Sequence, residues 1–252
     1  MITRGTWRVM AAAIACVACT VTGSLGDVAL HEAKKAGGKV LRTDSGRETS
    51  TGRQIIVVIG ASYARGWTDF SPGKFTIVNK GVDGDQSSGM LERFKKDVID
   101  ERPDVVIIWG FINDIFRSSR EGIDPTLERT RKNMSKMADL ARANGIKPIL
   151  ATEVTIRGRS GIKETIASWL GRIKGGESYQ DYVNTHVLRT NQWIRGYALE
   201  QRIPLLDFQP LLADGEGRRK PEYATEDGSH LSALAYTRLS QYAGDKLTRG
   251  MW

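Results

Sequence analysis

The chain has 252 residues, of which 40% are apolar and 26% are charged, as in an ordinary soluble globular protein. Its formal net charge of +8 permits weak attraction to anionic lipid, glycan or nucleic acid but is too small to indicate any of them. No apolar run approaches the roughly 20 residues of an ordinary transmembrane helix.

Residues 1–24 have the layout of a secretory signal peptide or lipoprotein leader. Two arginines precede an uncharged apolar run over 9–21, and small residues follow it. Both cysteines lie inside this run. The segment ending at Cys19 resembles a bacterial lipobox, although Cys16 stands where that motif has leucine. Lipidation at Cys19, cleavage near Ser24 and an uncleaved signal anchor therefore remain as alternatives. Each implies export to the periplasm or beyond, with membrane anchoring if the leader is retained.

Residues 25–53 are polar and irregular, with a glycine pair and a run rich in serine and threonine. This composition is typical of a flexible tether. The folded domain is predicted over 54–252.

The domain opens with the β-branched apolar run 55–59. Such a run is typical of a strand buried on both faces of a parallel sheet. It ends at Gly60-Ala61-Ser62. Because open α/β sheets bind ligands outside the carboxyl ends of their strands, Ser62 is a candidate nucleophile.

Strands and helices alternate along the rest of the domain. Further strands are predicted at 75–79, 105–109, 148–152 and 204–207, and helices at 87–96, 124–145, 182–201 and 231–247. Asp124 is expected to cap the second of these helices. This alternation predicts parallel βαβ units. The expected fold is α/β, a three-layer α/β/α sandwich around a central parallel, flavodoxin-like sheet of about five strands. We find no internal repeat and expect one domain.

A serine nucleophile needs a base, and the chain has three histidines. His31 lies in the tether, and His186 lies inside a predicted helix, where a structural role is expected. His230 follows Asp227 by three residues across a turn. That spacing lets the carboxylate bond one ring nitrogen and leaves the other for a hydroxyl proton. A helix-capping aspartate beside an incidental histidine has the same spacing.

Two further loops at strand ends carry candidate oxyanion donors. Gly84 follows the strand 75–79, and Asn113 follows the strand 105–109. A backbone N–H and a side-chain amide close to Ser62 would form an oxyanion hole. Alone, glycine and asparagine are ordinary loop formers. Their occurrence together with a serine and an Asp-His pair favours a catalytic site.

In this order, these residues resemble the SGNH hydrolase superfamily, also called GDSL esterases and lipases. The resemblance spans about residues 54–247. The matching blocks are Gly60-Ala61-Ser62, 79–85, 113–114 and 227–232. The resemblance implies a triad of Ser62, Asp227 and His230, and an oxyanion hole formed by Ser62, Gly84 and Asn113. It implies no metal and no organic cofactor.

Two positions depart from the family pattern. Ala61 stands where the first block has aspartate, and Phe111 stands where a glycine usually lies two residues before Asn113. Phe111 and Trp109 are expected to contact the substrate, with Phe111 either narrowing the acyl pocket or altering how the loop carries Asn113. Classical α/β-hydrolases fit less well, because they place glycine where this chain has Ala64.

The segment 157–178 is a candidate lid insertion. Within it, 161–174 has an amphipathic helical pattern with a basic face. This helix packs on the domain, covers Ser62 as a lid, or makes weak contact with an anionic membrane surface.

The sequence therefore predicts an exported serine esterase that removes short acyl groups from carbohydrate or envelope substrates. The alternatives are a lysophospholipase or lipase for longer acyl chains, an O-acyltransferase, and a non-catalytic glycan-binding module. The expected partner is a small-molecule or glycan ester, without nucleic acid. The sequence predicts no oligomeric state.

Overall fold

The computed structural model describes residues 53–157 and 178–250. The predicted leader, all of the tether except Arg53, and the segment 158–177 lie outside the described residues. The predictions of export, lipidation, a lid and a membrane-facing helix therefore stay predictions.

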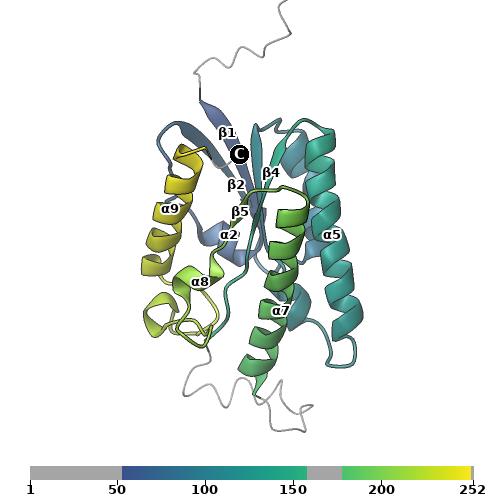
Figure 1. The fold of residues 1–252 in the computed structure, drawn as a ribbon, viewed down its shortest axis with the longest axis vertical. Coiled ribbons are helices and arrows are strands. Elements are labelled where there is room, and N and C mark those ends of the chain that lie inside the picture. The colour runs from purple at the N-terminus through teal and green to yellow at the C-terminus, as the bar shows by residue number, and fades with distance from the viewer. Residues whose placement is uncertain (1–52, 158–177, 251–252) are drawn as a thin grey trace, which may run out of the picture. The chain divides into compact units, whose positions relative to one another are not determined.

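Five strands form one sheet in the order β2-β1-β3-β4-β5 (Figure 1). They are β1 (Gln54–Gly60), β2 (Phe75–Gly81), β3 (Val105–Trp109), β4 (Lys147–Ala151) and β5 (Leu205–Leu206). Every neighbouring pair is parallel. The predicted parallel α/β architecture is confirmed.

The helices cover both faces of this sheet. They are α2 (Ser62–Gly66), α3 (Ser87–Phe94), α4 (Ile112–Phe116), α5 (Ile123–Ala143), α7 (Tyr179–Glu200), α8 (Gln209–Leu212) and α9 (Ala233–Thr248). A π-helical turn (Lys95–Ile99) continues α3, and a 3-10 turn (Pro221–Tyr223) precedes α9. Figure 1 shows α5 and α7 on one side of the sheet and α9 on the other.

Two helix starts differ from the prediction. Asp124 does not cap α5, because the helix begins at Ile123 and the Asp124 carboxylate instead pairs with Arg189 on α7 at 2.6 Å. The helix α7 begins three residues earlier than expected, because the Ser178 hydroxyl accepts the N–H of Asp181 at 3.1 Å. A capping side chain therefore sets the start of α7, whereas no side chain caps the start of α5.

The centre of the sheet leaves no room for a side chain where β1 ends. Residues 56–59 are at most 1% exposed. At Gly60, a Cβ would lie 2.0 Å from the Trp109 carbonyl oxygen on β3 and 2.6 Å from the Ala64 Cβ. Because β1 and β3 approach so closely here, the chain turns from β1 directly into α2, and Ser62 is the first residue of that helix.

Gly60→Ala is expected to destabilise the fold by about 3 kcal/mol, the upper range for overpacking a core. The clashing oxygen belongs to a strand backbone and cannot rotate away. Urea denaturation measures the effect as a lower midpoint. Gly196→Ala on α7 is the control, since a Cβ there meets no atom within 4 Å and should stabilise the helix by up to about 1 kcal/mol. Equal midpoints for Gly60→Ala and wild type would contradict the expectation.

Candidate active site

Ser62 is the first residue of α2, at the carboxyl end of the central strand β1. The strand β1 pairs with β2 on one side and β3 on the other. The chain therefore adds its next strand on one side of β1 and the following strand on the opposite side. Such a topological switch point is where open α/β sheets bind ligands. The Ser62 side chain is partly exposed there.

The loop after β2 is bonded to the same strand end. The Val82 N–H donates to the Gly60 carbonyl at 3.0 Å. Gly84 has a φ of +70°, a left-handed conformation that glycine adopts without strain. The Arg117 guanidinium donates to the Gly84 carbonyl at 2.7 Å. These contacts bring the Gly84 loop next to the segment that carries Ser62.

Asn113 lies on α4 and faces this loop. Its Nδ2 donates to the Asp85 carbonyl at 2.9 Å, which uses one of the two amide hydrogens. The next residue, Asp114, is buried and accepts the Ser87 N–H at 2.8 Å and hydroxyl at 2.6 Å. Burial raises the pKa of Asp114. The hydrogen bonds from Ser87 favour the charged carboxylate and oppose this rise, but they do not cancel it. The carboxyl fixes α4, and with it Asn113, against the start of α3.

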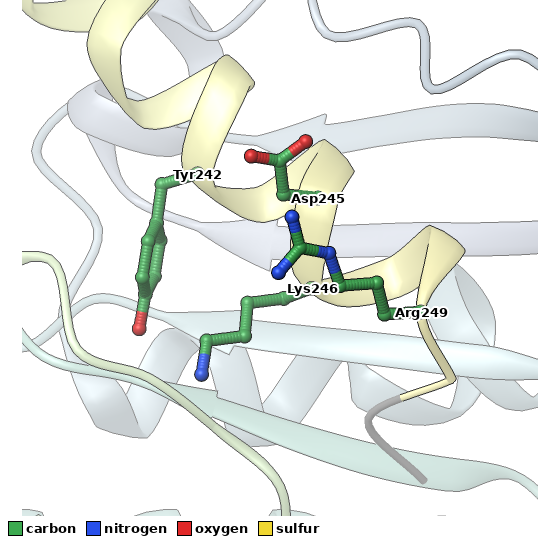
Figure 2. A pocket seen from close by; sticks show the side chains of 4 residues that line it. All are labelled: Tyr242, Asp245, Lys246 and Arg249. Carbon is green, nitrogen blue, oxygen red and sulfur yellow. The ribbon is translucent and has the colours of Figure 1, made fainter.

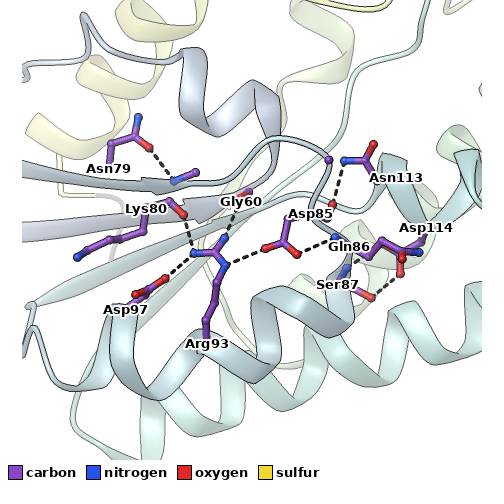
Figure 3. A network of polar contacts seen from close by, with 12 residues as sticks. Gly60, Asn79, Lys80, Asp85, Gln86, Ser87, Arg93, Asp97, Asn113 and Asp114 are labelled. Atoms are coloured by element: carbon purple, nitrogen blue, oxygen red, sulfur yellow. Dashed lines mark hydrogen bonds and ion pairs between the residues drawn. The ribbon is translucent and has the colours of Figure 1, made fainter.

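A single arginine on α3 ties the two strand ends together (Figure 3). Arg93 donates to the carbonyl of Gly60 at 3.0 Å and to that of Lys80 at 2.7 Å. It also pairs with Asp85 at 2.7 Å and with Asp97 at 2.8 Å. Sequence reasoning missed Arg93. The spacing to Asp97 predicts an ion pair on the helix but says nothing of the carbonyl contacts.

Asp227 and His230 form a direct pair. The carboxylate Oδ2 lies 2.5 Å from the ring Nδ1, while Oδ1 accepts the backbone N–H groups of Ser229 at 2.7 Å and of His230 at 2.9 Å. Partial burial alone would raise the pKa of Asp227. The hydrogen bonds from the His230 backbone and ring outweigh it and hold the pKa well below the ordinary carboxyl value. An ionised carboxylate on Nδ1 favours the tautomer whose Nε2 is unprotonated.

The serine and the histidine are linked through their neighbours. Across residues 53–157 and 178–250, no hydrogen bond joins the Ser62 hydroxyl to His230. The adjacent Tyr63 hydroxyl instead donates to the Ser229 carbonyl at 2.6 Å. Catalytic hydrogen bonds in unliganded enzymes are often long and shorten with substrate.

Trp109 and Phe111, the predicted substrate contacts, are both completely buried. The Trp109 ring packs edge-on against Trp67 and Phe208, with centroids 5.6 and 4.9 Å away. Such aromatic packing is favourable in a core. Neither side chain presents a surface to a substrate in this structure, because both rings are buried in the hydrophobic core.

Glu153, which follows β4, is a second buried group that sequence reasoning missed. Its Oε1 accepts the Phe111 N–H at the start of α4 at 3.0 Å. Burial raises the pKa of Glu153 to about 7, although the Phe111 and Ile112 N–H groups and the Arg219 charge oppose the shift. Its backbone is held by the Asn191 amide at 2.7 and 2.9 Å. No motif marks this residue, because its partners are more than 35 positions away in the chain.

Because of Glu153, the protein is expected to lose stability as the pH rises from about 5 to about 8. The folded-state pKa of about 7 lies above the ordinary 4.5, so the native state binds more protons than the unfolded chain in this window. The loss is on the order of 3 kcal/mol, from 1.36 kcal/mol per pKa unit. Urea denaturation of wild type and Glu153→Gln at both pH values measures it. The variant should show a smaller loss, and identical pH slopes would contradict the assignment to Glu153.

An open hollow on α9 lies apart from these residues (Figure 2). Tyr242, Asp245, Lys246 and Arg249 line it. Three of the four are charged, and none of the predicted catalytic or oxyanion residues lines it. Over the described residues, no three His, Cys, Asp or Glu side chains are grouped as metal ligands.

Known proteins resemble this chain in sequence and in structure. The model of the GDSL-like lipase/acylhydrolase family matches residues 57–238. A GDSL-like lipase from Bacteroides thetaiotaomicron is 25% identical, with a TM-score of 0.61, covering 78% of this chain and 88% of its own. An acetylxylan esterase from Geobacillus stearothermophilus is 17% identical, with a TM-score of 0.57, covering 78% and 95%.

A curated relative bears on location. The uncharacterized lipoprotein YqeF of Bacillus subtilis (strain 168) is 31% identical over 84 residues, which are 33% of this chain and 35% of the relative. This chain thus matches about a third of that protein's length. Within the described ranges, none of the helices combines the length and apolar character needed to cross a membrane.

The family match spans well over half of the chain and contains every residue that we compared with the sequence blocks. The resemblance to SGNH hydrolases is confirmed. The chain belongs to the GDSL-like lipase/acylhydrolase family, a family of carboxylic ester hydrolases.

Proposed function

We propose that this protein is an exported serine esterase that acts through Ser62, His230 and Asp227. The observation that carries the proposal is the 2.5 Å contact between the Asp227 carboxylate and His230 Nδ1. It lies on a loop bonded to the residue after Ser62. A carboxylate on Nδ1 leaves Nε2 free to accept the proton of a serine hydroxyl.

In the proposed reaction, the Ser62 oxygen attacks the ester carbonyl while His230 Nε2 takes its proton. The tetrahedral intermediate collapses, and the imidazolium donates that proton to the departing alcohol. Water, deprotonated by His230, then attacks the acyl-enzyme and releases the acid and the free serine. Asp227 stabilises the imidazolium in both steps and remains ionised throughout.

The Ser62 and Gly84 N–H groups and the Asn113 amide bind the developing oxyanion. Supporting this role, Asn113 has one amide hydrogen beyond the one bonded to Asp85. Gly84 and Asn113 are both anchored by Arg117, since the Arg117 backbone N–H donates to the Asn113 carbonyl at 3.1 Å. Each such donor is worth about 3 kcal/mol of transition-state stabilisation.

The substrate class that fits best is a short acyl ester on a carbohydrate or envelope polymer. The large apolar side chains that stand exposed in the described structure are Val82, Leu199 and Leu234. Three separate side chains offer little surface for a long acyl chain, which needs an extended apolar lining. The fold shared with an acetylxylan esterase is compatible with this substrate class.

A series of p-nitrophenyl esters from acetate to palmitate tests the proposal, with Ser62→Ala as the blank. Wild type should hydrolyse the acetate and butyrate esters fastest, and the blank should be slower by on the order of 10⁶-fold. Equal rates for both proteins would overturn the esterase. A maximum at long chains would overturn the short-acyl preference, and turnover only with an added sugar acceptor would indicate an acyltransferase.

Export is supported by the leader sequence and by the lipoprotein relative. The mass of the mature protein from its native host distinguishes the modes. A chain beginning at a diacylated Cys19 indicates a lipoprotein, and one beginning near residue 25 indicates cleavage. A full-length chain in the cytoplasmic fraction would contradict export.

A further inference from the structure

Arg219 is a fully buried cation. It follows α8 and forms an isolated antiparallel bridge with Ala213. Its guanidinium donates to four groups: the Thr155 carbonyl at 2.6 Å, the Ser229 and His230 carbonyls at 3.1 and 2.7 Å, and the Tyr63 hydroxyl at 2.5 Å. All four acceptors are neutral. Burying a charge with neutral partners is costly unless its hydrogen bonds are satisfied.

These contacts converge from three separate parts of the chain. Tyr63 follows Ser62 on α2, and Ser229 and His230 belong to the loop of the Asp-His pair. Thr155 belongs to the segment after β4. The Tyr63 hydroxyl completes the connection, because it accepts from Arg219 and donates to the Ser229 carbonyl. One buried side chain thus contacts the flanks of both proposed catalytic residues.

The proposed site needs such a connection. The Asp227 and His230 side chains are about half exposed, at 51% and 54%, so they are only partly packed against the body of the domain. Within the part of the chain that the structure describes, no hydrogen bond joins His230 to the Ser62 hydroxyl. The distance between base and nucleophile therefore depends on the backbone that carries each of them.

We propose that Arg219 is a positioning residue of the active site, which with Tyr63 fixes the His230 loop against the helix that carries Ser62. This inference rests on the proposed function. Arg219 touches neither the reacting serine oxygen nor the His230 ring, and acts only through the backbone and through Tyr63.

Arg219→Lys and Tyr63→Phe test the proposal by removing, respectively, most of the contacts of the guanidinium and a single hydroxyl. Lysine keeps the charge but cannot reproduce the planar, multidentate contacts of the guanidinium. Phenylalanine keeps the ring and removes only the hydroxyl, so this variant is expected to fold. For p-nitrophenyl acetate, kcat should fall by ~100-fold in Arg219→Lys, as for a small misplacement of catalytic groups, and by ~10-fold in Tyr63→Phe. KM should stay within about twofold, because no substrate-contacting group changes.

Two matched controls separate positioning from general destabilisation. Tyr197→Phe removes a hydroxyl that is hydrogen-bonded to Ser135 on α5. Arg195→Lys breaks a partly buried guanidinium fork on Asp207, with both contacts at 2.9 Å. Both controls should retain kcat within about twofold of wild type, even where their melting temperatures fall as far as those of the test variants.

Proton NMR of the His230 ring gives a readout independent of turnover. The short Asp227-His230 hydrogen bond should give a strongly downfield Nδ1–H signal. We expect Arg219→Lys and Tyr63→Phe to broaden or shift it, and both controls to leave it unchanged. If Ser62→Ala hydrolyses esters as fast as wild type, the proposed function fails, while the NMR comparison still tests the positioning.

Wild-type kcat and an unchanged His230 signal in folded Tyr63→Phe and Arg219→Lys would overturn the proposal. Losses of kcat in the controls that match those in the test variants would also overturn it, because they would show an effect of stability alone.

Discussion

Ser62→Ala is expected to lower kcat for p-nitrophenyl acetate by on the order of 10⁶-fold, and His230→Ala by a similar factor. The double variant should be no slower than either single variant. The serine oxygen becomes a nucleophile only as the imidazole takes its proton, so removing one partner already abolishes the function of the other. Steady-state kinetics of the three variants measures this directly.

His186→Gln is the matched histidine control for this experiment. His186 lies on α7 and packs its ring edge-on against Tyr182, with centroids 4.7 Å apart. Its kcat should stay within a few-fold of wild type. Losses that multiply in the double variant, or a loss in His186→Gln comparable to that in His230→Ala, would show that Ser62 and His230 do not work as one unit.

The residual activity of these variants reports on the remaining groups. The Gly84 and Asn113 donors do not depend on the serine hydroxyl or on the imidazole. Serine proteases that lack a triad residue still exceed the rate in water by roughly 10³- to 10⁴-fold. A residual rate of that order, lost on further substitution of Asn113→Ala, would support the proposed oxyanion hole.

The central strands were predictable from local sequence, and so was the position of the edge strand β5, but not its length. Residues 55–59 and 105–109 are apolar throughout, because β1 and β3 are covered on both faces. The predicted strand 204–207 pairs with β4 only at Leu205 and Leu206. The strand β5 has β4 as its one neighbour in the sheet, so its length is set by where the pairing with β4 ends and not by its own residues alone.

The contacts of the candidate site also differ in whether the local sequence predicts them. Asp227 and His230 are three residues apart, so their contact follows from a local turn that the sequence makes visible. Arg93, Glu153 and Arg219 act on residues 33, 42 and 156 positions away. A lone charged residue in an otherwise ordinary segment carries no sign of such partners. These three contacts require the folded backbone, and no pattern in the sequence predicts them.

Asp227→Asn is expected to lower kcat by about 10⁴-fold while leaving the loop folded. In the wild type, Oδ1 accepts the N–H groups of Ser229 and His230 and the Thr225 hydroxyl. The asparagine oxygen will take this position, because an NH₂ group cannot accept those three bonds. Its Nδ2 must then face His230 Nδ1.

An N–H donor at that position reverses the histidine tautomer. Nδ1 becomes the acceptor and Nε2 carries the hydrogen, so Nε2 can no longer take the proton of the Ser62 hydroxyl. Nitrogen NMR of a ¹⁵N-histidine sample at neutral pH will show protonated Nε2 in Asp227→Asn and protonated Nδ1 in wild type. The loss of activity should accompany this change of tautomer without a comparable fall in melting temperature.

Asp214→Asn is the matched control, since Asp214 also accepts backbone N–H groups in a surface loop, from Glu216 and Arg218 at 2.9 Å each. Hydrogen bonds from the Arg218 backbone lower the pKa of Asp214 as well, but over the described residues no hydrogen bond joins Asp214 to His230. The control should keep wild-type kcat. If Asp227→Asn retains kcat within tenfold of wild type with Nε2 protonated, then His230 is not the base that activates Ser62. The 2.5 Å contact between Asp227 and His230 would then only stabilise the loop.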